Sequence, residues 1–428
     1  AGTFIDYHSE FVDNVDGAKR DTTLENQQYT LGYTFSRPDI PLVDFSAKAY
    51  KNTTNLKQIR LNGSQYDPAG SRRSFEVETT GFDVFNTSRF DFGNTKVAFT
   101  YGGDAFEDQV VTSGYGTELT PSGRRTASGA FAQGKVTFFD TLDIIAALRY
   151  DHYELKGGDV HSEGERVSPK ITAGITPFNG VTIFATYAEG YRAPAITETL
   201  IEGTHSPPAT FPLLPNPDLK PEVAHNLEGG INIKRDNVLS SNDMFRAKLV
   251  AFQNKVDDYI DAVYEFGAYP PFGFALKYEN IQKATIEGIE LEAFYDTRLW
   301  FVGLGAHRIR GKNDDTGAPL ATIPADQVTL TLGMRAFDEK LVAGTRVRFV
   351  AAQERVPVPP PTSPDIPWLA TAGYTVVDLF GEYQLNENAT INVNIDNLFD
   401  KEYRQYLDLE NSPGFSARVG LTMRLGVQ

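Results

Sequence analysis

Residues 375–427 alternate apolar and polar side chains almost without error. In the last segment the apolar side chains take every second position: Phe415, Ala417, Val419, Leu421, Met423, Leu425 and Val427. The positions between them are polar or small and include Arg418 and Arg424. Because successive side chains of a strand point to opposite faces, this segment predicts a strand with one apolar face and one polar, partly cationic face. A soluble sandwich could not repeat this pattern with charge on its hidden side, whereas a membrane β-barrel requires it.

Similar alternating runs recur along the whole chain and are separated by connections that are short and long in turn. Short connections fall near residues 140–142, 178–181, 296–299, 338–341 and 386–388. Longer ones fall at about 112–125, 156–167, 192–222, 261–273, 311–325, 355–373 and 401–414. Outer-membrane barrels have short periplasmic turns and longer extracellular loops, so loop 192–222 is predicted to lie outside the cell. The pattern predicts an all-β, antiparallel, up-and-down transmembrane barrel with roughly 18 strands in this chain.

Composition excludes several other classes. The chain has no cysteine, which rules out a disulfide framework and thiolate–metal chemistry. No apolar stretch is long enough for a membrane-spanning helix. The net charge of −16 argues against nucleic acid as a partner, since such binding depends on clustered lysine and arginine. No Ser/His/Asp arrangement, phosphate-binding glycine loop or carboxylate dyad stands out, so the sequence does not predict an enzyme.

Three motifs resemble those of the TonB-dependent outer-membrane receptors. The first is Tyr-Ala-Glu-Gly-Tyr-Arg-Ala-Pro at 187–194, followed by Asn-Pro-Asp-Leu-Lys-Pro-Glu at 216–222. The second is Tyr-Glu-Asn at 278–280 with Ala-Thr-Ile-Glu-Gly-Ile-Glu-Leu-Glu at 284–292. The third ends in Asp-Asn-Leu-Phe-Asp-Lys-Glu-Tyr at 396–403. Together and in this order the motifs are specific, and the ladder of strands extends the resemblance over the whole chain.

The resemblance implies a multi-pass barrel of about 22 strands in a Gram-negative outer membrane, closed from inside by an N-terminal plug domain. It further implies a monomer, surrounded by outer-membrane lipid and lipopolysaccharide, that imports a scarce iron compound with energy delivered by the TonB complex. This chain departs from that pattern, because it contains neither a plug nor a TonB-contacting peptide. We therefore expect residues 1–428 to be the C-terminal part of the barrel domain, with the plug and the first strands upstream.

Several arginines fall on the polar, lumen-facing side of their strands: Arg335, Arg346, Arg348, Arg418 and Arg424. A buried charge needs a partner, and a folded plug could supply carboxylates and carbonyls. A water-filled diffusion porin is the alternative, since basic and acidic residues can face each other across a channel. Composition alone does not separate the two, and the family motifs favour the plug.

The resemblance extends to the haem and haemophore receptors through loop 192–222. In those receptors a histidine between the Arg-Ala-Pro and Asn-Pro-X-Leu motifs is an axial ligand of haem iron, and His205 occupies that position in this sequence. The motif residues that flank this loop are Tyr191, Arg192, Ala193, Pro194, Asn216, Pro217, Asp218 and Leu219. An apolar slot for haem could use Phe211, Leu213 and Leu214. A ferric-siderophore receptor is the alternative, because the same motifs are structural there.

The transported ligand is therefore expected to be haem or another iron chelate, with no catalytic cofactor and no metal site other than haem iron at His205. A haemophore or haemoglobin is expected as a protein partner, and the proline-rich segment 355–367 is a candidate contact for it. Two further histidines are minor candidates: His161, expected in a loop, and His307, expected to point into the barrel.

Overall fold

The structure, a computed structural model, consists almost entirely of β-strands. It describes residues 2–15, 18–63, 68–115, 117, 119–204, 211–270, 273–357, 370–408 and 410–424. These residues form one sheet of 20 strands and one short helix. No helix among the described residues is long and apolar enough to cross a lipid bilayer.

Long strands make up both halves of the chain, and three short elements lie between the halves. The first half contains β1 Gly2–Val15, β2 Ala18–Ser36, β3 Asp44–Arg60, β4 Arg72–Asp91, β5 Thr95–Gly114, β6 Gly123–Phe138, β7 Leu142–Gly157, β8 Val160–Phe178 and β9 Val181–Arg192. The β9–β12 connection contains α1 Ile196–Leu200, β10 Gly203–Thr204 and β11 Pro212–Leu214. The second half contains β12 Glu222–Asp236, β13 Met244–Phe266, β14 Phe274–Asp296, β15 Trp300–Asn313, β16 Gln327–Ala336, β17 Leu341–Val350, β18 Tyr374–Asn386, β19 Ala389–Asp396 and β20 Ser416–Met423.

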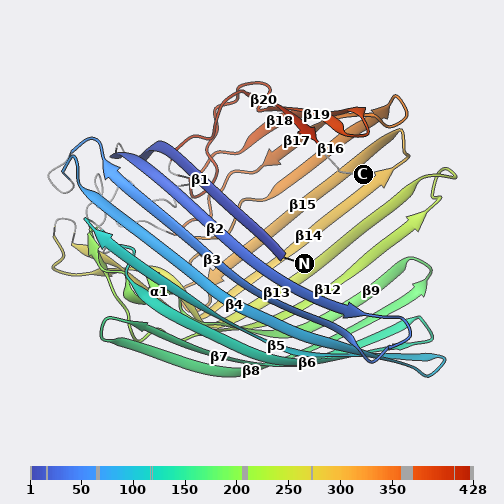
Figure 1. The fold of residues 1–428 in the computed structure, drawn as a ribbon, viewed down its shortest axis with the longest axis horizontal. Helices are drawn as coiled ribbons and strands as arrows, with labels where there is room; N and C mark the ends of the chain where they lie inside the picture. The colour runs from blue at the N-terminus through green and yellow to red at the C-terminus, as the bar shows by residue number, and fades with distance from the viewer. Residues whose placement is uncertain are drawn as a thin grey trace.

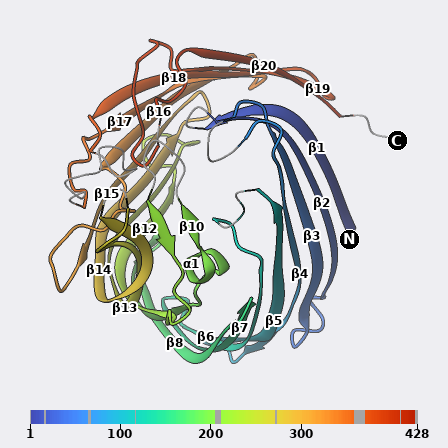
Figure 2. The same cartoon turned by 90° about the vertical axis from the view of Figure 1, so that its left-hand side faces the viewer.

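Each long strand pairs antiparallel with its neighbour in sequence, from β1 to β20 (Figure 1). Strand β9 pairs directly with β12, so the up-and-down series of long strands skips the short β10–β11 hairpin, whose β11 pairs parallel with β14. Eighteen strands remain in the wall, which confirms the predicted all-β, up-and-down antiparallel architecture. Seen along its axis, this wall curves round an interior that contains α1 and β10 (Figure 2).

The alternation in the sequence becomes two chemically different faces of the wall. In β20 the apolar side chains are exposed, with Val419, Leu421 and Met423 at 77%, 60% and 61% of their full area. Cross-strand pairing joins such positions into continuous rows: Ile231 lies opposite Leu249, and Leu249 opposite Leu291. Apolar surface left in water costs about 25 cal/mol per Å², so a face of this extent requires hydrocarbon around it.

Six of the seven predicted long connections separate consecutive long strands by seven residues or more. The predicted loop at 156–167 is wrong, because β7 and β8 continue to Gly157 and Val160 and form a tight hairpin. Gly158 in this turn has a φ of +56°, a conformation that suits glycine. The polar side chains of this segment are typical of a loop, but they pair across the strands instead. His161 Nε2 lies 3.0 Å from the carboxylate of Glu154, for example.

Candidate functional site

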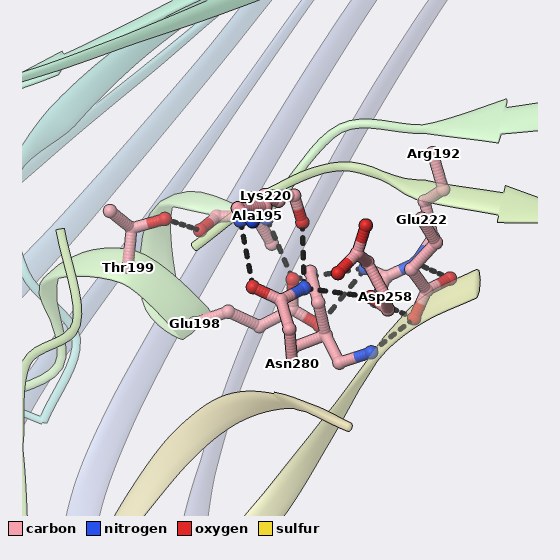
Figure 3. Close-up of polar contacts among 9 residues, drawn as sticks. Arg192, Ala195, Glu198, Thr199, Lys220, Glu222, Asp258 and Asn280 are labelled. Carbon is pink, nitrogen blue, oxygen red and sulfur yellow. Dashed lines mark hydrogen bonds and ion pairs between the residues drawn. The ribbon is translucent and has the colours of Figure 1, made fainter. Parts of the chain in front are cut away.

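The guanidinium group of Arg192 binds side chains at both ends of the β9–β12 connection, residues 193–221. Arg192, at the end of β9, donates from Nε and Nη2 to the two carboxylate oxygens of Glu222, at the start of β12, and both distances are 2.6 Å. Its Nη1 donates to the carboxylate of Glu198 in α1, at 3.0 and 2.9 Å (Figure 3). The connection is therefore anchored at its start, at its end and at its helix by a single side chain.

The carboxylate of Glu222 is the buried partner in this arrangement. Its residue is 9% exposed, and Oε1 also accepts the backbone N–H of Ile260 in β13 at 2.8 Å. The hydrogen bonds to Glu222, helped by those to Glu198, raise the pKa of Arg192 above its usual range against the opposing effect of burial. Arg192 therefore carries a positive charge in this site.

Two asparagines fix the returning half of the connection to the neighbouring strands. Asn216 donates from Nδ2 to the carbonyl of Tyr278 in β14 at 2.8 Å. Asn280 accepts the N–H of Lys220 at 2.8 Å and donates to the carbonyl of the same residue at 2.9 Å (Figure 3). Its Nδ2 also donates to the carbonyl of Asp258 in β13 at 2.7 Å. Each amide side chain thus forms hydrogen bonds with backbone groups, of the kind that a neighbouring strand would otherwise provide.

The short helix α1 is stabilised at its N-terminal end by Glu198 and along one side by packing against β7. The Glu198 carboxylate accepts the N–H of Ala195 at 2.8 Å, and the Thr199 hydroxyl donates to the carbonyl of Ala195 at 3.0 Å. Ile196 packs with Tyr153 and Leu155 of β7. A helix of five residues would not form alone in water, so tertiary contacts hold it.

A second apolar cluster lies under the β10–β11 hairpin and contains Ile201, Phe211, Leu213 and Phe274. The rings of Phe211 and Phe274 are 5.2 Å apart, and Phe211 and Leu213 are each 7% exposed. Both side chains therefore pack the hairpin against β14, which leaves little of either to line an open slot for haem. Leu214 is half-buried.

The flanking motif residues thus come together around the two stems of this connection. Tyr191 packs against Tyr153, with ring centres 6.2 Å apart, while Pro194 and Leu219 are buried. Ala193 packs against the cluster that holds α1. Pro217 and Asp218 are exposed, and the N–H of Asp218 is bonded to the side chain of Asn216 at 3.2 Å.

His205 lies outside the described residues, which resume at Phe211. The sequence alone indicated no role for Glu198, Glu222 or Asn280, the three side chains that do most of the fastening. Glu222 and Asn280 close the Lys-Pro-Glu and Tyr-Glu-Asn runs of the motifs, which was the available signal.

The family model described as TonB dependent receptor-like, beta-barrel, matches residues 2–398 of this chain. The chain belongs to this family. Its members are transport receptors, and the family implies the outer membrane of a Gram-negative bacterium.

The chain is similar to several curated proteins over most of its length. It is 27% identical over 429 residues to "Heme/hemopexin utilization protein C" of Haemophilus influenzae, covering 93% of this chain and 57% of that protein. It is 29% identical over 393 residues to "Hemin receptor" of Yersinia enterocolitica, covering 87% and 55%. The chain therefore spans a little over half the length of these relatives.

Two solved structures share the fold. The hemophore receptor HasR of Serratia marcescens, solved as a double mutant with its hemophore HasA and heme, has a TM-score of 0.80 and 24% identity, covering 99% of this chain and 68% of that one. The copper transporter OprC has a TM-score of 0.77 and 18% identity, covering 99% and 69%.

Two of the five predicted lumen arginines of this receptor barrel have carboxylate partners within the wall. Arg335 binds Asp296 through two hydrogen bonds of 2.8 and 2.9 Å. Arg418 donates to Asp396 at 2.5 Å. Arg335 of β16 binds the last residue of β14, and Arg418 of β20 binds the last residue of β19, so neither arginine depends on a plug for a partner.

The other three lumen arginines have no carboxylate partner among the described residues. Arg346 and Arg348 point to the face opposite the exposed ring of Phe349, and neither forms an ion pair or side-chain hydrogen bond there. Arg424 follows β20, and its backbone N–H is bonded to the carbonyl of Asn388. Contact of these arginines with a plug stays a prediction.

The two minor histidine candidates are engaged in local contacts. His161 belongs to β8 rather than to a loop, and its ring nitrogen contacts Glu154. His307, on β15, has Nε2 3.1 Å from the carbonyl oxygen of Ala325. Of the candidate protein-contact segment 355–367, only residues 355–357 are described.

Proposed function

We propose that this chain forms the barrel of an outer-membrane receptor that captures haem at the extracellular face and imports it. In this proposal residues 1–428 are the C-terminal part of the receptor. The plug and the TonB-contacting peptide, which would couple import to TonB-derived energy, lie N-terminal to residue 1. The names of the relatives, a hemin receptor and a heme/hemopexin utilization protein, support haem as the cargo.

The observation that carries the proposal is the clamp formed by Arg192, Glu198 and Glu222 together with Asn216 and Asn280. It fixes both stems of the connection that contains His205. An axial ligand must be presented at a reproducible position, and ordering a free loop would reduce the affinity for haem. Binding both stems to the wall lowers that cost.

His205 is then proposed as one axial ligand of the haem iron, bound through a neutral imidazole nitrogen. The plug would supply the second ligand. Transport requires binding and release but no bond to be made or broken in haem, so we infer that the protein is not an enzyme. We further propose that a haem-carrying protein, a haemophore or haemoglobin, delivers the ligand.

The test is a titration of the full-length receptor, plug included, with haem while the Soret band is followed. We expect His205→Ala to shift the Soret band and to weaken binding about tenfold or more, which corresponds to about 1.4 kcal/mol. His161→Ala is the matched control, since His161 is also an exposed extracellular histidine.

A His205→Ala receptor with an unaltered spectrum and affinity would refute the axial assignment. A wild-type receptor that binds a ferric siderophore and not haem would refute haem as the cargo. Conductance of a freely permeable channel through the full-length protein would instead support a diffusion porin.

A further inference from the structure

A depression of about 430 Å³ lies on the lumen face of the wall, across β12–β16 and towards the periplasmic ends of these strands. Two adjacent cross-strand rows line it. One row contains Lys248, Glu292, Gly305 and Thr329, and the other contains Arg246, Phe294, Gly303 and Thr331. These positions alternate with the exposed apolar face that contains Leu249, so their side chains point into the barrel. The volume falls within the range of about 300–1,000 Å³ that small-molecule sites have.

Two glycines of β15 form the floor of the depression, and the packing of the wall does not require them. A Cβ atom at Gly305 would meet no atom within 4 Å, and one at Gly303 would come no closer than 3.5 Å to its neighbours. Gly333 in β16 is different, because a Cβ atom there would collide with the ring of Phe301. A glycine inside a strand is less stable than alanine, and it often marks a place where a ligand approaches the backbone closely.

Cations lie on both sides of this floor. Four of them form no ion pair and no side-chain hydrogen bond among the described residues: Lys234, Lys248, Arg346 and Arg348. The two arginines lie opposite the threonines of β16 and extend the same rows. A fifth cation, Arg246, is paired with Asp236 at 2.6 Å. In the described strands these rows contain two carboxylates, Glu292 and Asp378, so positive charge is in excess and favours an anionic occupant.

Aromatic rings line the periplasmic side of the depression. The ring of Phe294 lies 5.7 Å from that of Phe301, which in turn stacks on Phe380 at 6.5 Å between ring centres. Phe301 is two residues from Gly303 in the same strand and therefore shares its face. Rings of this kind stack with another aromatic ring. The site thus combines a flat apolar surface with cations at its margin, which fits a planar ring molecule that carries carboxylates.

We propose that this depression is a second site for the haem cargo, at the periplasmic exit of the barrel. The porphyrin ring lies over Gly303 and Gly305 beside Phe294, and its propionate groups pair with the surrounding lysines and arginines. Haem that has left the extracellular capture site is held here before its release. This inference rests on haem as the cargo. It does not depend on His205, because the cations bind the propionates and no iron ligand is required.

The test uses the full-length receptor, plug included, and protoporphyrin IX, which carries the propionates of haem but no iron. Because this chain has no cysteine, Gly305→Cys places a single thiol in it, at a position where a Cβ atom meets no neighbour. Mass spectrometry follows the alkylation of this thiol by N-ethylmaleimide, with the parent receptor as the background. At about ten times its dissociation constant, protoporphyrin IX should slow alkylation about tenfold.

Thr172→Cys is the matched control for the position of the thiol. Thr172 faces the lumen from β8, next to the exposed outward side chain of Ile171, and does not line the depression. Alkylation at position 172 should be unaffected by protoporphyrin IX, because the porphyrin is bound on another part of the wall.

The charges are tested in the Gly305→Cys background. Lys234→Gln/Lys248→Gln should raise the concentration of protoporphyrin IX that gives half-maximal protection about tenfold. Lys48→Gln/Lys170→Gln is the matched control and should leave this concentration unchanged. Both of its lysines face the lumen, are exposed, form no ion pair among the described residues and do not line the depression.

Three results would each overturn the proposal. The first is equal protection at position 172, which would indicate non-specific adsorption of the porphyrin. The second is undiminished protection in the Lys234→Gln/Lys248→Gln variant. The third is a thiol at position 305 that is not alkylated even without porphyrin, which would show that part of the plug fills the depression.

Adding His205→Ala to the Gly305→Cys receptor separates this inference from the capture site. Protection at position 305 that persists in this variant supports an exit site independent of the axial ligand. A Soret band that responds to haem through His205, without protection at position 305, would refute the exit site alone. Protection at position 305 in a receptor whose Soret band does not respond to haem would refute the capture site and support this one.

Discussion

Replacing Arg192 by methionine removes the charge of the clamp while it keeps a side chain of similar length. Glu222, whose side chain is 11% exposed, would lose both of its guanidinium hydrogen bonds and keep only the N–H of Ile260. Breaking a fully buried ion pair costs about 3–5 kcal/mol, and an exposed pair contributes below about 1 kcal/mol. Because the Arg192 side chain is 44% exposed, water screens part of the interaction, and we expect about 2 kcal/mol.

This loss should appear as local opening of the connection rather than as unfolding of the wall. About 2 kcal/mol corresponds to a roughly 30-fold larger population of the opened stem. Hydrogen exchange reports it directly at Thr199, Ile201 and Asn216, whose backbone N–H groups are bonded to carbonyls inside the connection. These amides should exchange roughly 30-fold faster, while amides of β4 and β5 keep their protection.

Arg124→Met is the matched control, since Arg124 pairs with Glu107 on a neighbouring strand and is 59% exposed. It should leave exchange in the connection unchanged. Arg192→Lys keeps the charge without the two-pronged contact and should give an intermediate rate. Exchange at Ile201 and Asn216 that stays within about twofold of the wild type in Arg192→Met would refute the clamp as the anchor of the stems.

Two further predictions concern the periplasmic end. Arg335→Ala should lower the free energy of unfolding by about 3 kcal/mol, because it leaves Asp296, whose side chain is 9% exposed, without its cation. The control Arg346→Ala removes an exposed arginine that has no ion pair in the described region, and it should change the free energy of unfolding by less than about 0.5 kcal/mol. Equal effects of the two substitutions in urea titrations would contradict this reasoning. The carboxylate of Asp243 accepts hydrogen bonds from three backbone N–H groups of its turn and from the hydroxyl of Tyr295. Burial raises the pKa of this carboxyl, but the hydrogen bonds outweigh burial and lower the pKa from 3.8 to about 2. A lowered pKa stabilises the ionised folded state, so the turn should keep its exchange protection above pH 3.8 and lose it as the pH falls towards about 2, and Asp243→Asn should abolish this pH dependence.

The wall of this receptor barrel could be predicted from the sequence because the signal is local. Each strand alternates with a period of two, so the apolar and polar faces follow from single residues such as Val419 and Arg418. The hairpin at Gly157–Val160 shows the limit of that logic. The polar run 161–166 is typical of a loop, and only its register with β7 shows that the segment is paired.

The clamp could not be predicted in the same way. The motif residues around the β9–β12 connection were recognisable, but their roles depend on partners far away in sequence, such as Tyr278 for Asn216. The same holds for Arg335. The sequence shows only a charge on the lumen face, and the structure shows that this charge is paired with Asp296.

By itself, the sequence determined that the chain forms antiparallel strands and which side chains face lipid, since these properties depend on neighbouring residues alone. Only the tertiary structure decided how the two stems of the β9–β12 connection are fixed to the wall, and which carboxylates neutralise Arg335 and Arg418. These features depend on the register between strands, which sets side chains from distant parts of the chain at a fixed distance.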